Sequence, residues 1–181
     1  MPKYRRAYTP GASYFFTVVS HARQPIFLHD QVRQALRAAI ISTRVHYPFA
    51  IDAWVLLPDH MHCIWTLPNN DHQFSNRWGI IKRQVSQAWA GDGSLLHLSN
   101  SRNKRRESGL WQRRFWEHQI RDEDDFQRHI DYIHWNPVKH QYVSKVIDWP
   151  YSSFHRYVKT GLLPPNWGAS FEDPGKCNFG E

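Results

Sequence analysis

Residues 49–67, FAIDAWVLLPDHMHCIWTL, decide the fold. Two apolar runs, FAIDAWVLL (49–57) and HCIWTL (62–67), are joined around Pro58-Asp59, and so short a connection favours an antiparallel hairpin. His60 and His62 open the second strand of this hairpin. Because successive side chains on a strand point to opposite faces, both imidazoles are expected on one face of the sheet.

The flanking sequence predicts the rest of an α+β fold. Asp122 is the expected N-cap of the last helix, and Pro137 is expected to end that helix at Asn136. Further strands are predicted at 13–20 and 114–120, and helices at 29–46, 72–90 and 123–136, from period-two and helical spacing respectively. This order suits an antiparallel sheet covered by helices.

Length and composition indicate one globular domain. The 181 residues include 41% hydrophobic and 15% aromatic residues, which excludes a disordered chain. Only two cysteines are present, so a disulfide scaffold and a cysteine-rich zinc module are excluded, and no Walker loop or GxGxxG supports a nucleotide cofactor. We therefore predict a single domain over 1–181, with a basic loop at 91–110 and a C-terminal tail from about 160. No apolar run approaches the about 20 residues of a membrane span, and the N-terminus lacks a secretory signal, so a cytoplasmic location is expected.

A formal charge of +7 favours a polyanionic partner, since lysine and arginine that neutralise phosphates release condensed counterions. Nine Trp and eight Tyr could stack unpaired bases, although a solvated basic surface over an aromatic core would have the same composition. The basic residues are grouped as Lys3, Arg5 and Arg6, then Arg77, Lys82 and Arg83, then Arg102, Lys104, Arg105, Arg106, Arg113 and Arg114.

Two features suggest chemistry. His60 and His62 could clamp a metal ion, or could be ordinary core histidines. Tyr132 and Asn136 lie four residues apart and so share a helix face, beside the buried stripe that Ile130 and Ile133 help to form. A tyrosine there could be a nucleophile with an amide oxygen ligand one turn later, or could simply pack at the edge of the core.

Together these features resemble the single-tyrosine HUH transposases, and among them the REP-associated tyrosine transposases of bacteria. The matching strings are WVLLPDHMHCIWTLP (54–68), LWQRRFWEHQIRDEDDFQRHIDYIHWNPVKH (110–140) and WPYSSFHR (149–156), with YRRAY (4–8) and SYFFTV (13–18) near the N-terminus. The resemblance covers about residues 3–160 and implies the ferredoxin-like HUH fold.

By this resemblance, Tyr132 is the nucleophile, and His60, His62 and Asn136 bind a divalent ion, Mg²⁺ or Mn²⁺. Relatives with the wider HUH fold often have Gln or Glu as third ligand, so His140 and His129 stay open as alternatives to Asn136. Attack by the tyrosine on a phosphate would leave a 5′-phosphotyrosine link and a free 3′-OH, which can later reseal the strand.

The resemblance also implies a partner, single-stranded DNA beside short palindromic hairpins, and a cytoplasmic, nucleoid-associated enzyme. It favours a monomer over the helix-swapped dimers of insertion-sequence relatives. The basic groups above are the expected DNA contacts, with Lys3, Arg5 and Arg6 at the single-stranded foot of the hairpin, and His118 either reaches the DNA or metal or is an ordinary edge-strand histidine. Two other functions stay open: a domesticated DNA-binding protein that no longer transposes, and a metal-dependent nuclease that uses water.

Overall fold

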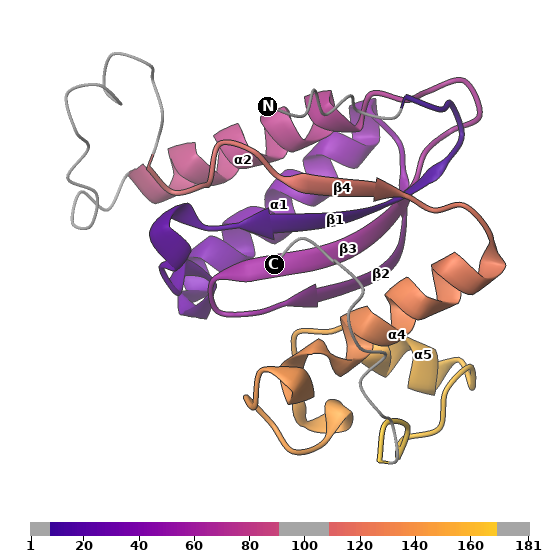
Figure 1. The fold of residues 1–181 in the computed structure, drawn as a ribbon. Helices are drawn as coiled ribbons and strands as arrows, with labels where there is room; N and C mark the ends of the chain where they lie inside the picture. The colour runs from indigo at the N-terminus through magenta and orange to yellow at the C-terminus, as the bar shows by residue number, and fades with distance from the viewer. Residues whose placement is uncertain (1–7, 91–108, 170–181) are drawn as a thin grey trace, which may run out of the picture.

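The computed structural model describes residues 8–90 and 109–169, which form a four-stranded antiparallel sheet with helices on both faces (Figure 1). The strands are β1 (Ser13–Val19), β2 (Ala50–Leu56), β3 (His60–Thr66) and β4 (Trp116–Gln119), in the spatial order β2-β3-β1-β4. This is the strand order of the ferredoxin-like split βαβ arrangement. The expected fold class is therefore confirmed.

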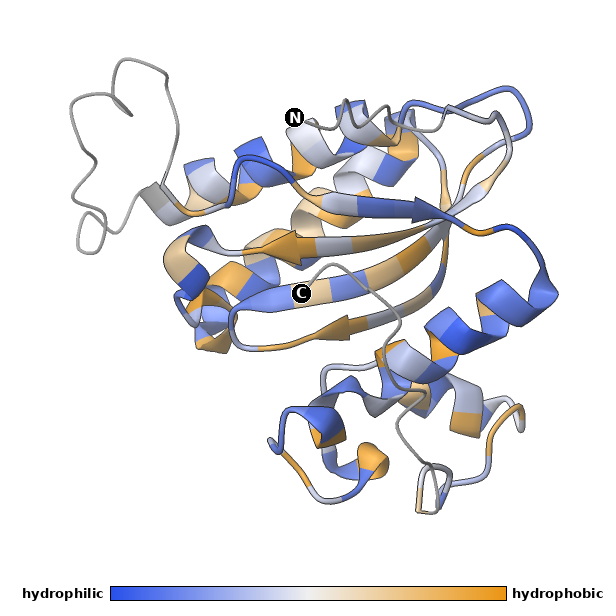
Figure 2. Cartoon of the chain, in the orientation of Figure 1, coloured by the Kyte–Doolittle hydropathy of each residue, from blue (hydrophilic) through white to orange (hydrophobic). Residues whose placement is uncertain are grey.

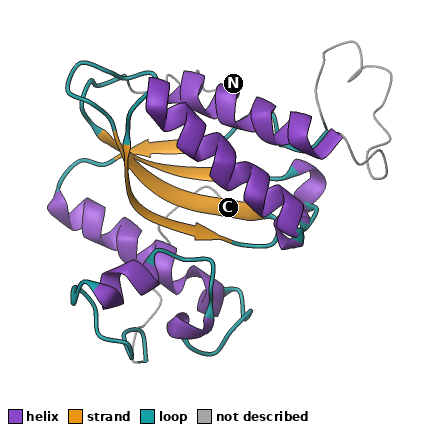
Figure 3. Ribbon diagram, turned by 180° about the vertical axis from the view of Figure 1, so that it is seen from behind, coloured by secondary structure: helices purple, strands orange, loops and turns teal. Residues whose placement is uncertain are grey.

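The helices lie in two layers. Helices α1 (Asp30–His46) and α2 (Phe74–Ala90) cover one face of the sheet, as Figure 3 shows from behind, and α4 (Glu123–Lys139) packs on the opposite face against β2 and β3. The short elements are the 3₁₀ turns η1 (His21–Arg23), η2 (Ile26–Leu28) and η3 (Val146–Asp148) and the helix α5 (Phe154–Lys159). Every helix in the described part of the chain is too short or too polar to span a bilayer.

Alternation along the strands divides the core between the two faces. On β1, Tyr14, Phe16 and Val18 face α1 and α2, whereas Phe15 faces α4 together with Ile64 of β3. Because both faces of β1 are buried, most residues of this central strand are apolar, and it appears mainly orange in Figure 2. The sheet thereby presents one buried face to α4, and that face carries the candidate site.

The hairpin predicted from residues 49–67 is present, with Leu56 opposite Met61 and the amide of Leu57 bonded to the carbonyl of His60 at 2.8 Å. The second strand begins at His60 itself. The predicted strands near 13–20 and 114–120 and the helices near 29–46 and 72–90 are also present, with ends shifted by up to two residues. Of the predicted basic loop at 91–110, residues 91–108 lie outside the described part of the chain, and the tail is described only to residue 169.

Pro137 does not end the last helix, so that prediction was wrong. Asp122 caps α4 as expected by accepting a hydrogen bond from the Asp125 amide at 2.8 Å, but the helix continues through Pro137 to Lys139. Proline removes one amide donor, and here the loss falls in the last turn, where the amides of His140 and Tyr142 bond to the carbonyls of Asn136 and Pro137. The extra turn places Lys139 on the same helix as Tyr132.

Candidate active site

Two histidines of β3 share the sheet face that α4 covers. The side chains of His60 and His62 alternate with Met61 and Cys63, which belong to the core under α1 and α2. Both imidazoles are buried, at 1% and 0% exposure, and their ring centroids lie 4.9 Å apart. The predicted pairing of the two histidines on one face is therefore present in the structure.

Each of these rings has a hydrogen-bond partner on Nδ1. Nδ1 of His60 lies 2.6 Å from a carboxylate oxygen of Asp59, and Nδ1 of His62 lies 2.9 Å from the hydroxyl of Thr17 on β1. A histidine that donates from Nδ1 ligates a metal through Nε2, and such partners fix the orientation of the ring. The arrangement thus makes Nε2 the nitrogen that each ring would offer to an ion.

Asp59, the hydrogen-bond partner of His60, is ionised. Burial acts to raise the pKa of Asp59, but the hydrogen bond to His60 and the nearby Arg23 guanidinium, 3.2 Å away, together keep that pKa below its ordinary value. An ionised acceptor strengthens the hydrogen bond from His60. Asp59 therefore supports His60 much as a carboxylate supports a metal-binding histidine.

Tyr132 lies against the histidine pair. Its side chain is 1% exposed, and its ring centroid is 5.2 Å from that of His62 and 6.1 Å from that of Phe15. Two turns later on α4, the ammonium of Lys139 donates a hydrogen bond to the Tyr132 hydroxyl at 3.2 Å and lies 4.7 Å from the centre of its ring. The structure thus joins the predicted nucleophile to the predicted metal clamp, and adds a cation at the phenolic oxygen.

Asn136 and His140 are the candidates for a third ligand near the pair. Asn136 is fully buried one turn after Tyr132, on the same face of α4. His140, the residue that follows the helix, has its ring centroid 5.3 Å from that of His60. His129 instead packs against His118, with ring centroids 4.8 Å apart. The choice between Asn136 and His140 stays a prediction.

The C-terminal segment fixes α4 in place. Nε2 of His134 lies 3.0 Å from the Ser153 hydroxyl, which bonds in turn to the amide and carbonyl of Trp54 on β2 at 2.9 and 3.1 Å. The indole of Trp149 donates to the carbonyl of Leu56 at 3.0 Å. Burial, with a smaller effect of Arg156, lowers the pKa of His134 to about 3, so this histidine is neutral at pH 7. The WPYSS segment is therefore what ties the tyrosine helix to the sheet.

The basic residues predicted to contact DNA fall into different environments. Arg83, Arg113 and Arg114 are exposed, whereas Lys82 is half-buried, donates to the carbonyl of Gln112 at 3.1 Å and lies over aromatic rings. Arg113 and Arg114 lie shortly before β4, the edge strand next to β1, with Phe115 between Arg114 and the strand. Seven more of the predicted contacts lie outside the described residues: Lys3, Arg5, Arg6, Arg102, Lys104, Arg105 and Arg106.

Arg77 is not a DNA contact, so that prediction was wrong. Its side chain is 0% exposed, and its guanidinium pairs with Asp71 at 2.7 Å and donates to the carbonyls of Tyr47 and Pro48 at 3.2 and 2.9 Å. The predicted helix was correct, but Arg77 is on its inner face, where its charge is paired inside the protein. Arg77 therefore serves the fold.

His118 lies on the α4 side of β4, half-buried, with Nε2 2.7 Å from a carboxylate oxygen of Asp125. Its position between the edge strand and α4 differs from that of a surface histidine on an edge strand.

Thr17, Asp59 and Lys139 are the site residues that the sequence did not reveal. Asp59 is adjacent to His60, and Lys139 follows Tyr132 by seven residues, a helical spacing that could have been noticed. Thr17 comes beside His62 only through the pairing of β1 with β3, which no local pattern specifies.

Known proteins are similar to this chain in sequence and in fold. A REP-associated tyrosine transposase of Escherichia coli K12 is 47% identical to this chain over 173 residues, which are 96% of this chain and 94% of the relative. A Haemophilus influenzae protein that is named as a putative member of the same group is 46% identical over 170 residues, which are 94% of this chain and 95% of the relative. A solved structure of a REP-associated tyrosine transposase bound to a REP hairpin is 45% identical, with a TM-score of 0.84 over 100% of this chain and 98% of the other. No family model matches the sequence.

Proposed function

The chain belongs to the REP-associated tyrosine transposases, and on that premise we propose that it cuts and rejoins single-stranded DNA beside REP hairpins, with Tyr132 as the nucleophile. One observation carries the proposal: Tyr132 packs against the His60–His62 pair, with its ring 5.2 Å from His62, on a buried face formed by two separate elements. Membership in the family makes the chain an enzyme, and the residue roles are our proposal.

The donor set fits a divalent ion. His60 and His62 offer imidazole nitrogens whose Nδ1 atoms already have partners, and Asn136 or His140 would complete the set with an amide oxygen or a third imidazole. Imidazole with an amide oxygen is a borderline ligand set, which suits Mn²⁺ better than Mg²⁺, although Mg²⁺ is the more abundant ion in cells. When bound, such an ion polarises the scissile phosphate and offsets charge in the transition state.

The chain's own groups position the nucleophile. The oxygen of Tyr132 would form a bond to phosphorus while the bond from phosphorus to the 3′ oxygen breaks, which leaves a 5′-phosphotyrosine and a free 3′-OH. The phenol gives up a proton and the departing 3′ oxygen takes one, so the step consumes no ATP and reverses to reseal the strand. Lys139 holds the attacking oxygen by its hydrogen bond, and its positive charge favours the oxygen as negative charge develops there.

The path of the DNA is proposed along the β4 edge. Arg113 and Arg114 are exposed just before β4, and Arg83 is exposed on the α2 layer behind it, so phosphates that pass around this edge would meet all three. Lys3, Arg5 and Arg6 stay the proposed contacts for the single-stranded foot. Phosphate contacts position the DNA, and base contacts choose it.

An end-labelled oligonucleotide tests the chemistry. A REP hairpin with a single-stranded flank is incubated with the full chain and Mn²⁺, and products are resolved on a denaturing gel. We expect a protein–DNA adduct with a 3′ label and a free shorter strand with a 5′ label, because the tyrosine keeps the 5′ phosphate. Tyr132→Phe should abolish both products with hairpin affinity unchanged, while Tyr47→Phe, at the exposed end of α1, should behave like wild type.

Two outcomes would contradict the proposal. Cleavage without an adduct would indicate water as the nucleophile, and binding without cleavage in any divalent metal would indicate a domesticated DNA-binding protein. His60→Ala and His62→Ala should each lose cleavage, as should wild type in excess EDTA. Full activity in EDTA would exclude the metal clamp.

A further inference from the structure

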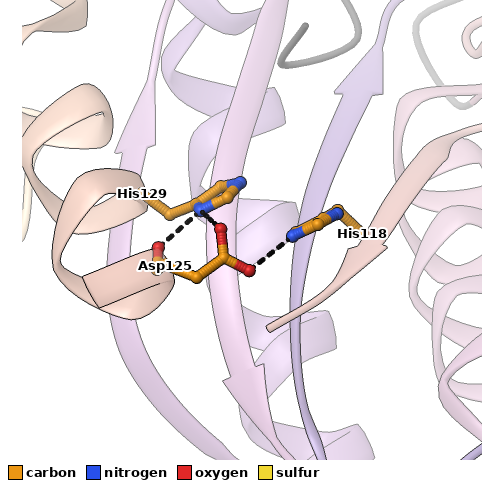
Figure 4. Close-up of side chains that lie close together, drawn as sticks. All are labelled: His118, Asp125 and His129. Carbon is orange, nitrogen blue, oxygen red and sulfur yellow. Dashed lines mark hydrogen bonds and ion pairs between the residues drawn. The ribbon is translucent and has the colours of Figure 1, made fainter. Parts of the chain in front are cut away.

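A second cluster of ligand-type side chains lies at the start of the tyrosine helix (Figure 4). His118 projects from β4, while Asp125 and His129 lie one turn apart on α4, and one donor atom from each falls within 4.8 Å of the others. The Asp125 carboxylate lies 2.7 Å from Nε2 of His118 and 3.4 Å from Nδ1 of His129. Among the described residues, this is the group of three that meets these distances.

The cluster is distinct from the His60–His62 pair. The ring of Phe15 stands between the two groups, with its centroid 4.8 Å from His129 and 5.4 Å from His62. An apolar ring offers no ligand and separates the two sets of donors. An ion held by the cluster would therefore be a second ion.

The donors suit a transition metal. Two imidazoles and one carboxylate form a borderline set, and bonds of about 2.1 Å to a tetrahedral Zn²⁺ would place neighbouring donors about 3.4 Å apart. The contact between His129 and Asp125 already has this spacing, and the contact between His118 and Asp125 would lengthen. The three side chains come from two elements, so the fold itself brings them together.

Both histidines donate through the nitrogen that faces the cluster, because the carboxylate and the carbonyl of Asp125 can only accept. Each ring would have to move this proton to its other nitrogen when it binds an ion. Nδ1 of His129 lies 2.7 Å from the Asp125 carbonyl, but that carbonyl also accepts the helical amide bond from residue 129, so it would keep a partner if Nδ1 turned to an ion. The Asp125 carboxylate accepts hydrogen bonds from His118 and from the amide and guanidinium of Arg121 on one oxygen, whereas His129 lies nearest the other oxygen.

Two arginines compete for the same carboxylate. Arg121 lies 3.3 Å and Arg128 3.5 Å from the oxygens of Asp125. Their side chains are 68% and 49% exposed, so both can turn into solvent when another cation approaches, whereas the side chains of Asp125 and His129 are 3% and 7% exposed and stay in place. The arginines neutralise the carboxylate when no ion is bound.

We propose that His118, Asp125 and His129 bind a divalent transition-metal ion, with Zn²⁺ as the best match. The ion would join the edge strand β4 to the first turns of α4, three residues before Tyr132. It would act as a structural brace that sets the position of the tyrosine helix, and would take no part in the bond exchange.

Metal titration of the full chain tests the proposal. Co²⁺ is added to a His60→Ala, His62→Ala variant, and binding is followed by the visible absorption of tetrahedral Co²⁺ and then by its displacement with Zn²⁺. We expect one ion per chain in this variant. Adding His118→Ala should weaken binding at least a hundredfold, while adding His46→Ala, an exposed histidine on α1, should leave it unchanged.

If the double variant does not fold, the same titration is done on single variants. Wild type should then bind two ions, and His118→Ala or His129→Ala one. The proposal is overturned if the metal-binding stoichiometry is the same with and without His118, or if weak binding falls equally in His46→Ala, which would mark surface histidines as the ligands. Circular dichroism of each metal-free variant establishes that the fold is retained.

Discussion

Removing the carboxylate that pairs with Arg77 should destabilise the whole fold. The guanidinium of Arg77 is fully buried and bonds to Asp71 at 3.1 and 2.7 Å and to main-chain carbonyls nearby, so Asp71→Asn leaves a buried charge with only neutral acceptors. Stranding a buried charge costs about 3–5 kcal/mol, and the 26% exposure of the Asp71 side chain places the expected loss near 3 kcal/mol. At about 2–4 °C per kcal/mol for a chain of this length, Tm should fall by about 6–12 °C.

The loss should depend on pH with a definite sign. The hydrogen bond from Arg77 is the main cause that holds the pKa of Asp71 below its ordinary value, against a smaller opposing effect of burial. A carboxyl with a lowered folded pKa contributes stability above its unfolded pKa of about 3.9, and this is lost as pH falls through the folded value. The difference in unfolding free energy between wild type and Asp71→Asn should therefore be largest near pH 7 and shrink below about pH 4.

Urea unfolding followed by circular dichroism measures both effects. The matched control is Asp30→Asn, which removes the exposed partner of Arg33 on α1 and should change the unfolding free energy by less than about 1 kcal/mol. If Asp71→Asn unfolds like wild type, the Arg77 pair contributes nothing and the reasoning fails. If Arg77→Met folds normally but loses affinity for hairpin DNA, the interpretation of Arg77 as a fold residue is refuted.

Three further predictions concern the site. Thr17→Val and Asp59→Asn should each weaken metal binding by about 10–100-fold, measured by Mn²⁺ titration, because the first removes the Nδ1 partner of His62 and the second replaces the charged Nδ1 partner of His60 by a neutral one; unchanged affinity would exclude that role. Lys139→Met should slow cleavage about 10–100-fold with hairpin affinity nearly unchanged, and Lys139→Arg should restore part of the rate; equal loss in both variants would indicate a packing role instead. Neutralising Arg113 and Arg114 together should flatten the slope of log affinity against log salt by about 1.4–1.8 units, on matched and mismatched hairpins alike; an unchanged slope would remove both from the DNA path.

Local patterns in the sequence were enough for the parts of the site that lie on single elements. His60 and His62 share a face because a strand alternates, and Tyr132 and Asn136 share a face because a helix repeats every 3.6 residues. Neither statement needs knowledge of the rest of the chain. The class of the fold, an antiparallel sheet covered by helices, followed from the same kind of pattern, whereas the ferredoxin-like HUH fold was implied by the family resemblance.

The wrong predictions have one physical origin, which is tertiary context. Arginine is a common DNA contact, but the charge of Arg77 is paired with Asp71 inside the protein and bonds to the carbonyls of Tyr47 and Pro48. Proline commonly ends a helix, but Pro137 lies in the last turn of α4, where the loss of one amide hydrogen-bond donor costs little stability. Thr17 escaped notice because only the pairing of β1 with β3 brings it to His62.

The bonds that link His134 on α4 through Ser153 to β2 have a consequence for whether one molecule or two would form an active site. In the structure of the single chain, α4 is fastened to the sheet of its own chain and Tyr132 meets His62 of the same polypeptide. We predict from this that each molecule carries both halves of the proposed site. Two inactive variants, one without the tyrosine and one without the histidine, would then fail to complement each other when mixed. The cleavage rate of such an enzyme would then rise in proportion to its concentration in the cell. An enzyme whose site needs helices exchanged between two molecules would instead be active only above the concentration at which dimers form.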